Sequence, residues 1–223
     1  MLISVPSYII PGTYLENLRF ISSINGINSV ELLFFVFTGE SWLLFKEEEK
    51  QILEYKNRFS FTLHMPLVLK RSSEEIIITT KDYVRYYIIH PPKIDMSEKD
   101  LAEYLSLIEE WRTNYGNIFL LENLVESKFT DIADRIEDLP ICFDTGHLLL
   151  RNEDPGEFIK KYNTRIKEIH LHGVKESKDH EVILPGEVWM ENIKPFLEEF
   201  EGVLNIEVFS SEKVYKILDL IMA

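Results

Sequence analysis

Cysteine, basic charge and long apolar runs are all scarce in this sequence. Cys142 is the only cysteine among 223 residues, which excludes an intrachain disulfide and a zinc site built from several thiolates. No stretch approaches the roughly 20 consecutive apolar residues that a membrane-spanning helix needs, and residues 1–5 lack the charged start of a signal peptide. We therefore expect a cytoplasmic protein with no membrane partner, in which any metal is bound mainly by His, Asp and Glu.

Positive charge is in the minority, with 24 Lys and Arg against 38 Asp and Glu and a net charge of −14. Non-specific affinity for nucleic acid comes from clustered Lys and Arg, so this balance argues against a nucleic-acid partner. It does not exclude a small phosphate ester as substrate, because bound metal ions would add positive charge that the formal count omits.

What the sequence does contain is an alternation of short β-rich runs and longer amphipathic segments, repeated eight times without a linker. This rhythm predicts βα units, and eight strands favour one closed (β/α)8 TIM barrel over residues 1–223 rather than an open doubly wound sheet. The expected strands are residues 2–5, 29–35, 59–64, 86–90, 117–122, 141–144, 168–172 and 204–209. The expected helices lie near residues 13–23, 41–57, 97–114, 128–137, 155–163, 187–200 and 211–222, whereas residues 72–82 predict only a short helix or a loop.

Side chains alternate along a strand, and this parity predicts which polar groups face the barrel interior. In residues 59–64 the apolar side chains share one face, so His64 points inward. Glu31 shares an inward face with Ser29 and Leu33, and it either joins a site or only forms hydrogen bonds within the barrel. The same parity turns further strand-end groups inward: Glu122, Asp144, His170, His172 and Glu207.

All six histidines lie at a predicted strand end or in the loop that follows it: His64, His90, His147, His170, His172 and His180. Catalytic groups of TIM barrels occupy this carboxyl-terminal mouth. Taken singly, a strand-end histidine is more often a hydrogen-bonded structural group than a ligand. Three carboxylates together in one apolar mouth would lose solvation and repel one another, and divalent cations would remove both costs. The pattern predicts one or more divalent ions, zinc or manganese being those expected for imidazole and carboxylate donors.

Seven short motifs follow one another along the chain, namely Leu63-His64-Met65-Pro66, His90, Leu121-Glu122-Asn123, Phe143-Asp144-Thr145-Gly146-His147, His170-Leu171-His172, Asp179-His180 and Ile206-Glu207. In this order they resemble the xylose-isomerase-like barrels, a superfamily that includes sugar-phosphate isomerases and apurinic endonucleases. The resemblance covers nearly the whole chain. Carried over from the endonuclease branch, it implies metal ligands at His64, His90, Glu122, Asp144, His147, His170, Asp179, His180 and Glu207. One departure is that Asp179 and His180 are adjacent, whereas that branch has one residue between them.

A narrower likeness is carried by Ser7-Tyr8-Ile9-Ile10-Pro11, Glu16-Asn17-Leu18-Arg19-Phe20, Val30-Glu31-Leu32-Leu33-Phe34-Phe35, His64-Met65-Pro66-Leu67 and His170-Leu171-His172-Gly173-Val174. These segments are similar to those of the cobamide-remodeling phosphodiesterase family. The likeness implies a metal-dependent hydrolase that cleaves the phosphodiester of a corrinoid nucleotide loop, giving a cobinamide phosphate and an α-riboside. The residues expected to be catalytic are Glu122, Glu207, His172, Asp179 and His180.

Two other functions stay open at this point. A sugar or sugar-phosphate isomerase or epimerase would use Glu122 and Glu207 as metal-bound acid and base for proton transfer beside a carbonyl. A non-catalytic barrel that binds a corrinoid or a metal would use the same pocket without turnover. The three alternatives share one fold and one set of ligands and differ in their chemistry, which a fold alone does not determine.

Overall fold

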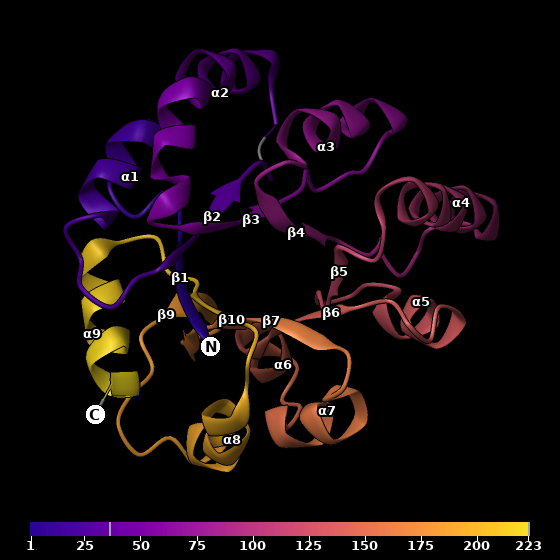
Figure 1. The fold of residues 1–223 in the computed structure, drawn as a ribbon. Helices are drawn as coiled ribbons and strands as arrows, with labels where there is room; N and C mark the ends of the chain where they lie inside the picture. Colours follow the sequence, from indigo (N-terminus) through magenta and orange to yellow (C-terminus); the bar gives the residue numbers. More distant parts are fainter. Residues whose placement is uncertain (36, 223) are drawn as a thin grey trace.

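Eight parallel strands form a closed barrel in the computed structural model, which describes residues 1–35 and 37–222. Their order around the barrel is β1-β10-β7-β6-β5-β4-β3-β2, and helices surround the ring (Figure 1). The strands are β1 (Leu2–Pro6), β2 (Ser29–Leu33), β3 (Ser60–His64), β4 (Val84–Ile89), β5 (Phe119–Glu122), β6 (Ile141–Asp144), β7 (Ile166–Leu171) and β10 (Val203–Ile206). The predicted TIM barrel is confirmed.

Helices follow the strands along the chain, close to the residue ranges expected from the sequence. They are α1 (Tyr14–Ile21), α2 (Gly39–Ile52), α3 (Glu74–Thr80), α4 (Glu98–Tyr115), α5 (Phe129–Arg135), α6 (Thr145–Leu150), α7 (Pro155–Tyr162), α8 (Val188–Glu199) and α9 (Ser211–Met222), with the 3-10 turns η1 (Leu53–Asn57) and η2 (Arg71–Ser73). The connection between β3 and β4, for which residues 72–82 predicted only a short helix or a loop, contains the short helix α3. Ile76 and Ile77 of this helix are fully buried. Burial of these two side chains outweighs their preference for β structure, because tertiary packing overrides local propensity.

Two pieces were not expected from the sequence, and both lie beside the candidate site. One is α6, which begins directly after β6, and the other is a hairpin of β8 (Gly173–Lys175) and β9 (Lys178–Glu181). The carboxylate of Asp144 caps α6 by accepting a hydrogen bond from the backbone N–H of His147 at 2.7 Å. A single strand-end residue therefore starts the helix that carries the next histidine.

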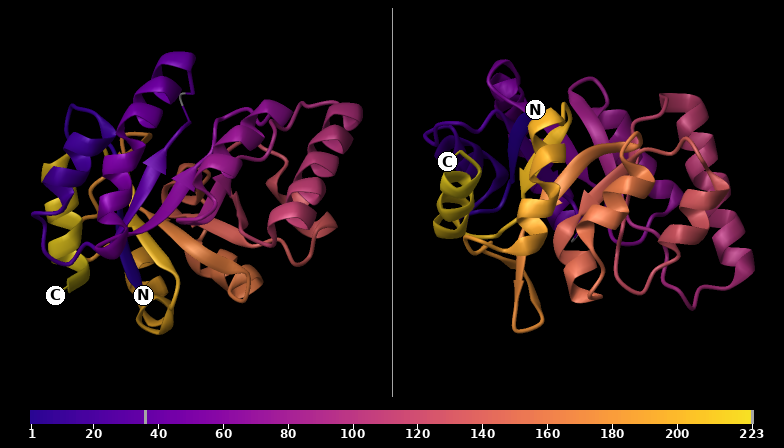
Figure 2. Two further views of the ribbon diagram at one scale, coloured as in Figure 1. Left: turned by 45° about the horizontal axis from the view of Figure 1, so that its top comes forward. Right: turned by 90° about the horizontal axis from the view of Figure 1, so that it is seen from below.

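The helices form the outer layer in every view (Figure 2). In α4 the side chains of Leu101, Tyr104, Ile108 and Trp111 are buried at intervals of three or four residues, so one stripe of the helix packs inward. None of the helices among the described residues combines the length and apolar character needed to cross a membrane.

The interior of the barrel has little apolar filling. Ile88, Leu120 and Cys142 form a small, fully buried cluster that is separate from the large core between strands and helices. Much of the remaining inward-facing surface is polar and buried, including Ser4, Glu31, Thr62, His64, Glu122, Asp144, Glu168, His170 and Asn205. Buried polar groups are costly unless they bind one another or a ligand, so this interior indicates a functional centre.

Candidate metal centre

The candidate ligands gather at the carboxyl-terminal end of the barrel, where parallel strands finish on the same rim. His64, Glu122 and Asp144 are the last residues of β3, β5 and β6. His90 follows β4 and Glu207 follows β10 directly. All of these side chains are buried, with exposed fractions between 0% and 8%. Side chains from distant segments of the chain, which strand parity predicted to face inward, therefore gather in one buried cluster.

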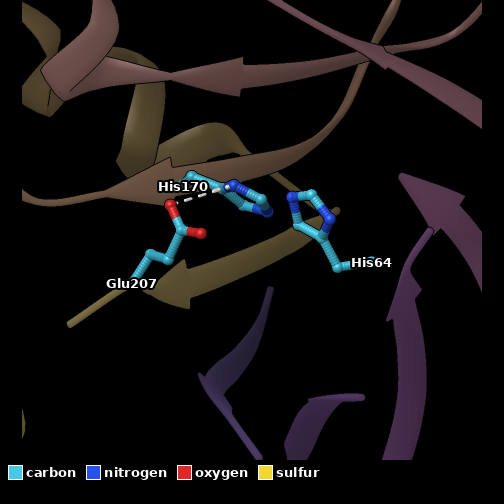
Figure 3. Close-up of side chains that lie close together, drawn as sticks. All are labelled: His64, His170 and Glu207. Atoms are coloured by element: carbon cyan, nitrogen blue, oxygen red, sulfur yellow. Dashed lines mark ion pairs between the residues drawn. The ribbon is translucent and has the colours of Figure 1, made fainter. Parts of the chain in front are cut away.

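Four residues form the central donor group: Glu122, Asp144, His170 and Glu207, whose donor atoms lie within 4.8 Å of one another. Nδ1 of His170 is 3.2 Å from Oε1 of Glu122, 3.2 Å from Oε2 of Glu207 and 3.9 Å from Oδ2 of Asp144. The imidazole of His170 and the carboxylate of Glu207 face each other, with the ring of His64 on the other side of His170 (Figure 3). Three carboxylates and one imidazole are a donor set suited to a divalent cation.

Unsatisfied buried atoms support the same conclusion. Oε2 of Glu207 and Nδ1 of His147 are buried and lie 3.2 Å from Nδ1 of His170 and 3.6 Å from Oδ2 of Asp144, respectively, but neither makes a hydrogen bond of good geometry to any of the described residues. Such groups nearly always have a partner in folded proteins. A divalent cation would provide one, so the residues present fit a bound metal ion.

The charges around the pocket keep its carboxylates ionised. Burial raises the pKa of Glu122, but His90 and then His170 lower it well below its usual value. Burial likewise raises the pKa of Glu207, and His170 lowers it below the usual value. Burial lowers the pKa of His64, but the hydrogen bond and the charge of Glu122 raise it to about 9. In the metal-free protein the negative charge that would attract a cation is therefore balanced in part by protonated imidazole.

A second donor group shares Glu122 with the first and consists of His64, His90 and Glu122. The Nε2 atoms of His64 and His90 lie 3.4 Å and 2.6 Å from Oε2 of Glu122. Glu122 thus presents Oε1 to His170 and Oε2 to the histidine pair, which is the arrangement of a carboxylate that can bridge two cations.

A third group combines His172, His180 and Glu207 near the hairpin. Nδ1 of His172 lies 2.9 Å from the backbone nitrogen of His180 and 3.3 Å from the carbonyl oxygen of Gly173. Nε2 of His172 lies 3.1 Å from Oδ2 of Asp144. In this arrangement His172 orients the carboxylate of Asp144 through a hydrogen bond.

Two residues of the predicted ligand set, His147 and Asp179, lie outside the donor groups of the described residues, and Asp179 is the more exposed of the two. Its side chain is 38% exposed, and its carboxylate is 3.8 Å from Nε2 of His180. It belongs to none of the donor groups found among the described residues. His180, by contrast, reaches the central group, with Nδ1 3.7 Å from Oε2 of Glu207.

Two buried carboxylates lie deeper in the barrel. Oε2 of Glu31 is 2.9 Å from Nε2 of His170, so Glu31 makes a hydrogen bond within the barrel and its partner is one of the predicted ligands. Glu168, which the sequence analysis did not select, accepts a hydrogen bond from Oγ1 of Thr62 at 3.0 Å. Burial and the charge of Glu31 raise the pKa of Glu168 well above its usual value. Parity would have identified Glu168, because it stands two residues before His170 on the same face of β7.

Two further polar side chains fix the backbone beneath the ligands. The amide of Asn123 accepts from the N–H of Asp144 at 2.7 Å and donates to its carbonyl oxygen at 2.8 Å. The hydroxyl of Thr145 lies 3.1 Å and 2.9 Å from the carbonyl oxygens of His170 and His172. These contacts hold the ends of β5, β6 and β7 in register, so that their side chains converge.

Comparison with known proteins links this chain to a family, to dehydratases and to epimerases. The model of the xylose isomerase-like TIM barrel family matches residues 81–219. An inosose dehydratase from Clostridium perfringens is 26% identical over 139 residues, which are 53% of this chain and 46% of that protein. One from Bacillus cereus is 34% identical over 95 residues, which are 41% of this chain and 29% of that protein. The matches thus span less than half the length of these curated relatives.

Two solved structures are similar over the full length of the chain. A D-tagatose 3-epimerase-like protein superposes with a TM-score of 0.73 at 17% identity, covering 100% of this chain and 96% of that one. The 3-keto-D-glucoside 4-epimerase of E. coli superposes with a TM-score of 0.68 at 15% identity, covering 100% of this chain and 98% of that one. At these identities the likeness shows the fold alone.

These comparisons overturn the hydrolase expected from the narrower resemblance. The curated relatives described above are inosose dehydratases, and the similar structures include epimerases. Cleavage of a corrinoid phosphodiester is therefore the wrong prediction, and a corrinoid is the wrong substrate class. The error arose because hydrolases and isomerases of this fold use similar ligand motifs, so the motifs identify the pocket better than the reaction.

Proposed function

Since the chain belongs to the xylose isomerase-like TIM barrel family, we propose that it is a metal-dependent isomerase or epimerase of sugars or related polyhydroxylated ketones. The observation that carries the proposal is the pair of buried carboxylates, Glu122 and Glu207, in one donor group with Asp144 and His170. Epimerisation and dehydration of such ketones share their first step, removal of a proton beside the carbonyl. The named relatives, dehydratases and epimerases, are consistent with this common step.

The four-residue group is the proposed site of the resident cation. A divalent ion bound there would polarise the carbonyl and the neighbouring hydroxyl of the substrate, which makes the adjacent C–H more acidic. Asp144 and His170 hold the middle of the site, on β6 and β7. Glu122 and Glu207 flank them, because β5 and β10 stand at the two ends of the run β5-β6-β7-β10.

The two flanking glutamates are the proposed proton carriers. His170 lowers the pKa of Glu207, so this carboxylate is ionised and able to accept a proton from carbon. Glu122 is ionised as well, because neighbouring histidines lower its pKa and the charge of His90 has the largest lowering effect. Because the carboxylates come from separate strands, one can remove a proton from one face of the carbon and the other can return a proton to the opposite face. Return to the opposite face inverts the centre, and return to the neighbouring carbon moves the carbonyl.

The burial of the pocket suits this chemistry. Glu122 and Glu207 are only 1% and 4% exposed. A site that excludes water strengthens electrostatic interactions with the developing enolate, and it protects the carbanion-like species from adventitious protonation.

Solvent exchange provides a direct test. The manganese- or zinc-loaded protein is incubated in D2O with a panel of ketohexoses, ketopentoses, 3-ketoglucosides and inosose, and proton NMR follows deuterium entering the carbon beside the carbonyl. We expect exchange with at least one member of the panel and its loss in Glu207→Gln. This readout reports proton removal even where the overall equilibrium lies with the substrate.

Two outcomes would overturn the proposal. Tight metal binding without deuterium exchange for any member of the panel would favour the non-catalytic binding barrel. Exchange that persists in the double variant Glu122→Gln, Glu207→Gln would remove both carboxylates from the reaction.

A further inference from the structure

We propose that Glu31 is a positioning residue for the metal centre. Its carboxylate accepts a hydrogen bond from the N–H at Nε2 of His170, so that Nδ1 carries no hydrogen and faces the cation. The inference rests on the proposed cation site. It assigns a task to a side chain on β2, which is three strands away from β7 around the barrel.

The two nitrogens of His170 have different surroundings. Nδ1 points to the central donor group, 3.2 Å from both Glu122 and Glu207. Nε2 lies on the other side of the ring, 2.9 Å from Oε2 of Glu31. The residues that make this last contact come from β2 and β7, which are not neighbours in the barrel, so the side chain of Glu31 reaches across the interior.

This geometry fixes the tautomer of the metal-binding ring. An imidazole binds a cation through a nitrogen lone pair, so Nδ1 must be free of hydrogen when the ion is bound and Nε2 must carry it. An ionised carboxylate has only lone pairs to offer, and it therefore binds the ring solely when Nε2 bears the hydrogen. Histidine ligands commonly make such a contact with a carboxylate, which orients the ring and makes it a stronger donor.

Burial argues that the contact is more than packing. Glu31 is fully buried, and its Oε1 makes no hydrogen bond to any of the described residues. A buried carboxylate is costly, and His170 is the hydrogen-bond partner of its other oxygen. A neutral glutamine would fit the same space at lower cost if the position served only to fill the barrel.

Glu168 provides a matched control. It is also fully buried inside the barrel and stands next to Glu31, but its hydrogen bond runs to Thr62. Glutamine at position 168 changes the same chemical group at nearly the same depth. It leaves the contact between Glu31 and His170 in place.

The experiment compares the zinc affinity of Glu31→Gln, Glu168→Gln and the unaltered protein in a competition titration with a chromogenic chelator. The glutamine amide can donate to Nε2 of His170, which favours the tautomer with a hydrogen on Nδ1 pointing at the cation. We expect Glu31→Gln to bind zinc roughly 10 to 100 times more weakly, as for other partners of ligating histidines. We expect Glu168→Gln to bind zinc as the unaltered protein does.

A second readout needs no variant and identifies the tautomer directly. In the zinc-loaded protein labelled with 15N-histidine, the His170 resonances, assigned with His170→Gln, should show a hydrogen on Nε2 and zinc on Nδ1. Zinc on Nε2, or equal zinc affinity of a folded Glu31→Gln and the unaltered protein, would overturn the role of Glu31 while leaving the cation site intact. Failure of the unaltered protein to bind zinc at all would instead overturn the proposed function together with this inference.

Discussion

Nε2 of His90 lies 2.6 Å from Oε2 of Glu122, while Oε1 of the same carboxylate lies 3.2 Å from Nδ1 of His170. One side chain is thus shared by the central donor group and by the group of His64 and His90. In the proposed reaction Glu122 needs a free oxygen for the proton. A second cation on the histidine side would occupy that oxygen.

Zinc should therefore activate the protein at the first equivalent and inhibit it at the second. The second ion would bind His64, His90 and Oε2 of Glu122, and it would withdraw the charge with which Glu122 carries a proton. Deuterium exchange measured during a zinc titration checks this, with the double variant His64→Ala, His90→Ala expected to escape inhibition. A rate that rises until two equivalents are bound would show instead that both ions serve the reaction.

Replacing Glu207 by glutamine should remove the base and keep the ligand. The amide oxygen can still contact a cation, but it cannot take a proton from carbon, so kcat should fall by roughly 10²- to 10⁴-fold. Steady-state kinetics and a zinc titration separate the two effects. Glu198→Gln on the exposed side of α8 is the matched control and should leave both values unchanged.

The metal-free protein should lose stability as the pH rises above neutrality. The pKa of His64 is raised to about 9 in the folded state, against an ordinary value of 6.5. The folded state binds this proton more tightly, so the contribution to the free energy of unfolding is complete below about pH 6.5. It is lost as the pH rises through about 9, and it amounts to at most on the order of 3 kcal/mol.

Urea unfolding between pH 6 and pH 10, in the presence of a chelator, measures this dependence. His64→Gln should make the profile shallower over that range, and His172, whose pKa is also raised to about 9, should account for part of the slope that remains. A free energy of unfolding that stays constant in the unaltered protein would show that His64 is neutral at pH 7. Zinc binding should strengthen over the same range, because the ion displaces protons from imidazole.

Gly146 leaves the room that the ring of His172 occupies. A β-carbon at this position would lie 2.0 Å from Cε1 and 2.4 Å from Nδ1 of that ring. We expect Gly146→Ala to destabilise the protein by about 1–3 kcal/mol and to push His172 away from Asp144. Thermal unfolding and zinc affinity measure the two effects. Gly39→Ala, where a β-carbon meets nothing within 4 Å, should be neutral, and equal behaviour of both variants would contradict the packing argument.

Asp179 should be dispensable, although the family resemblance implied a ligand there. Its half-exposed side chain lies outside the donor groups of the described residues. Asp179→Asn should change kcat/KM and zinc affinity by less than about twofold, as for most surface substitutions. His180 approaches Glu207 from the same hairpin, so His180→Ala is the informative comparison. A large loss of zinc affinity in Asp179→Asn would mean that β9 rearranges when the cation binds.

The strand pattern carried most of what could be predicted about the site. The alternation around His64, Glu122 and Asp144 is a local property with a period of two residues, and it placed these groups on the inner face before any contact was known. The unexpected hairpin β8-β9 has a different origin. Glu176, Ser177 and His180 all have positive φ there, a conformation that few residues other than glycine adopt, and His180 contacts His172 and Glu207.

The amino-acid sequence by itself determined the barrel, its order of strands and the rim at which imidazoles and carboxylates collect, because periodicity and chain order are encoded locally. Tertiary structure alone decided which interior groups touch across the barrel. Glu31 and His170 are 139 residues apart and on strands that are not neighbours, yet they meet at 2.9 Å. Their meeting depends on the stagger and closure of all eight strands together, which no single segment of the chain specifies.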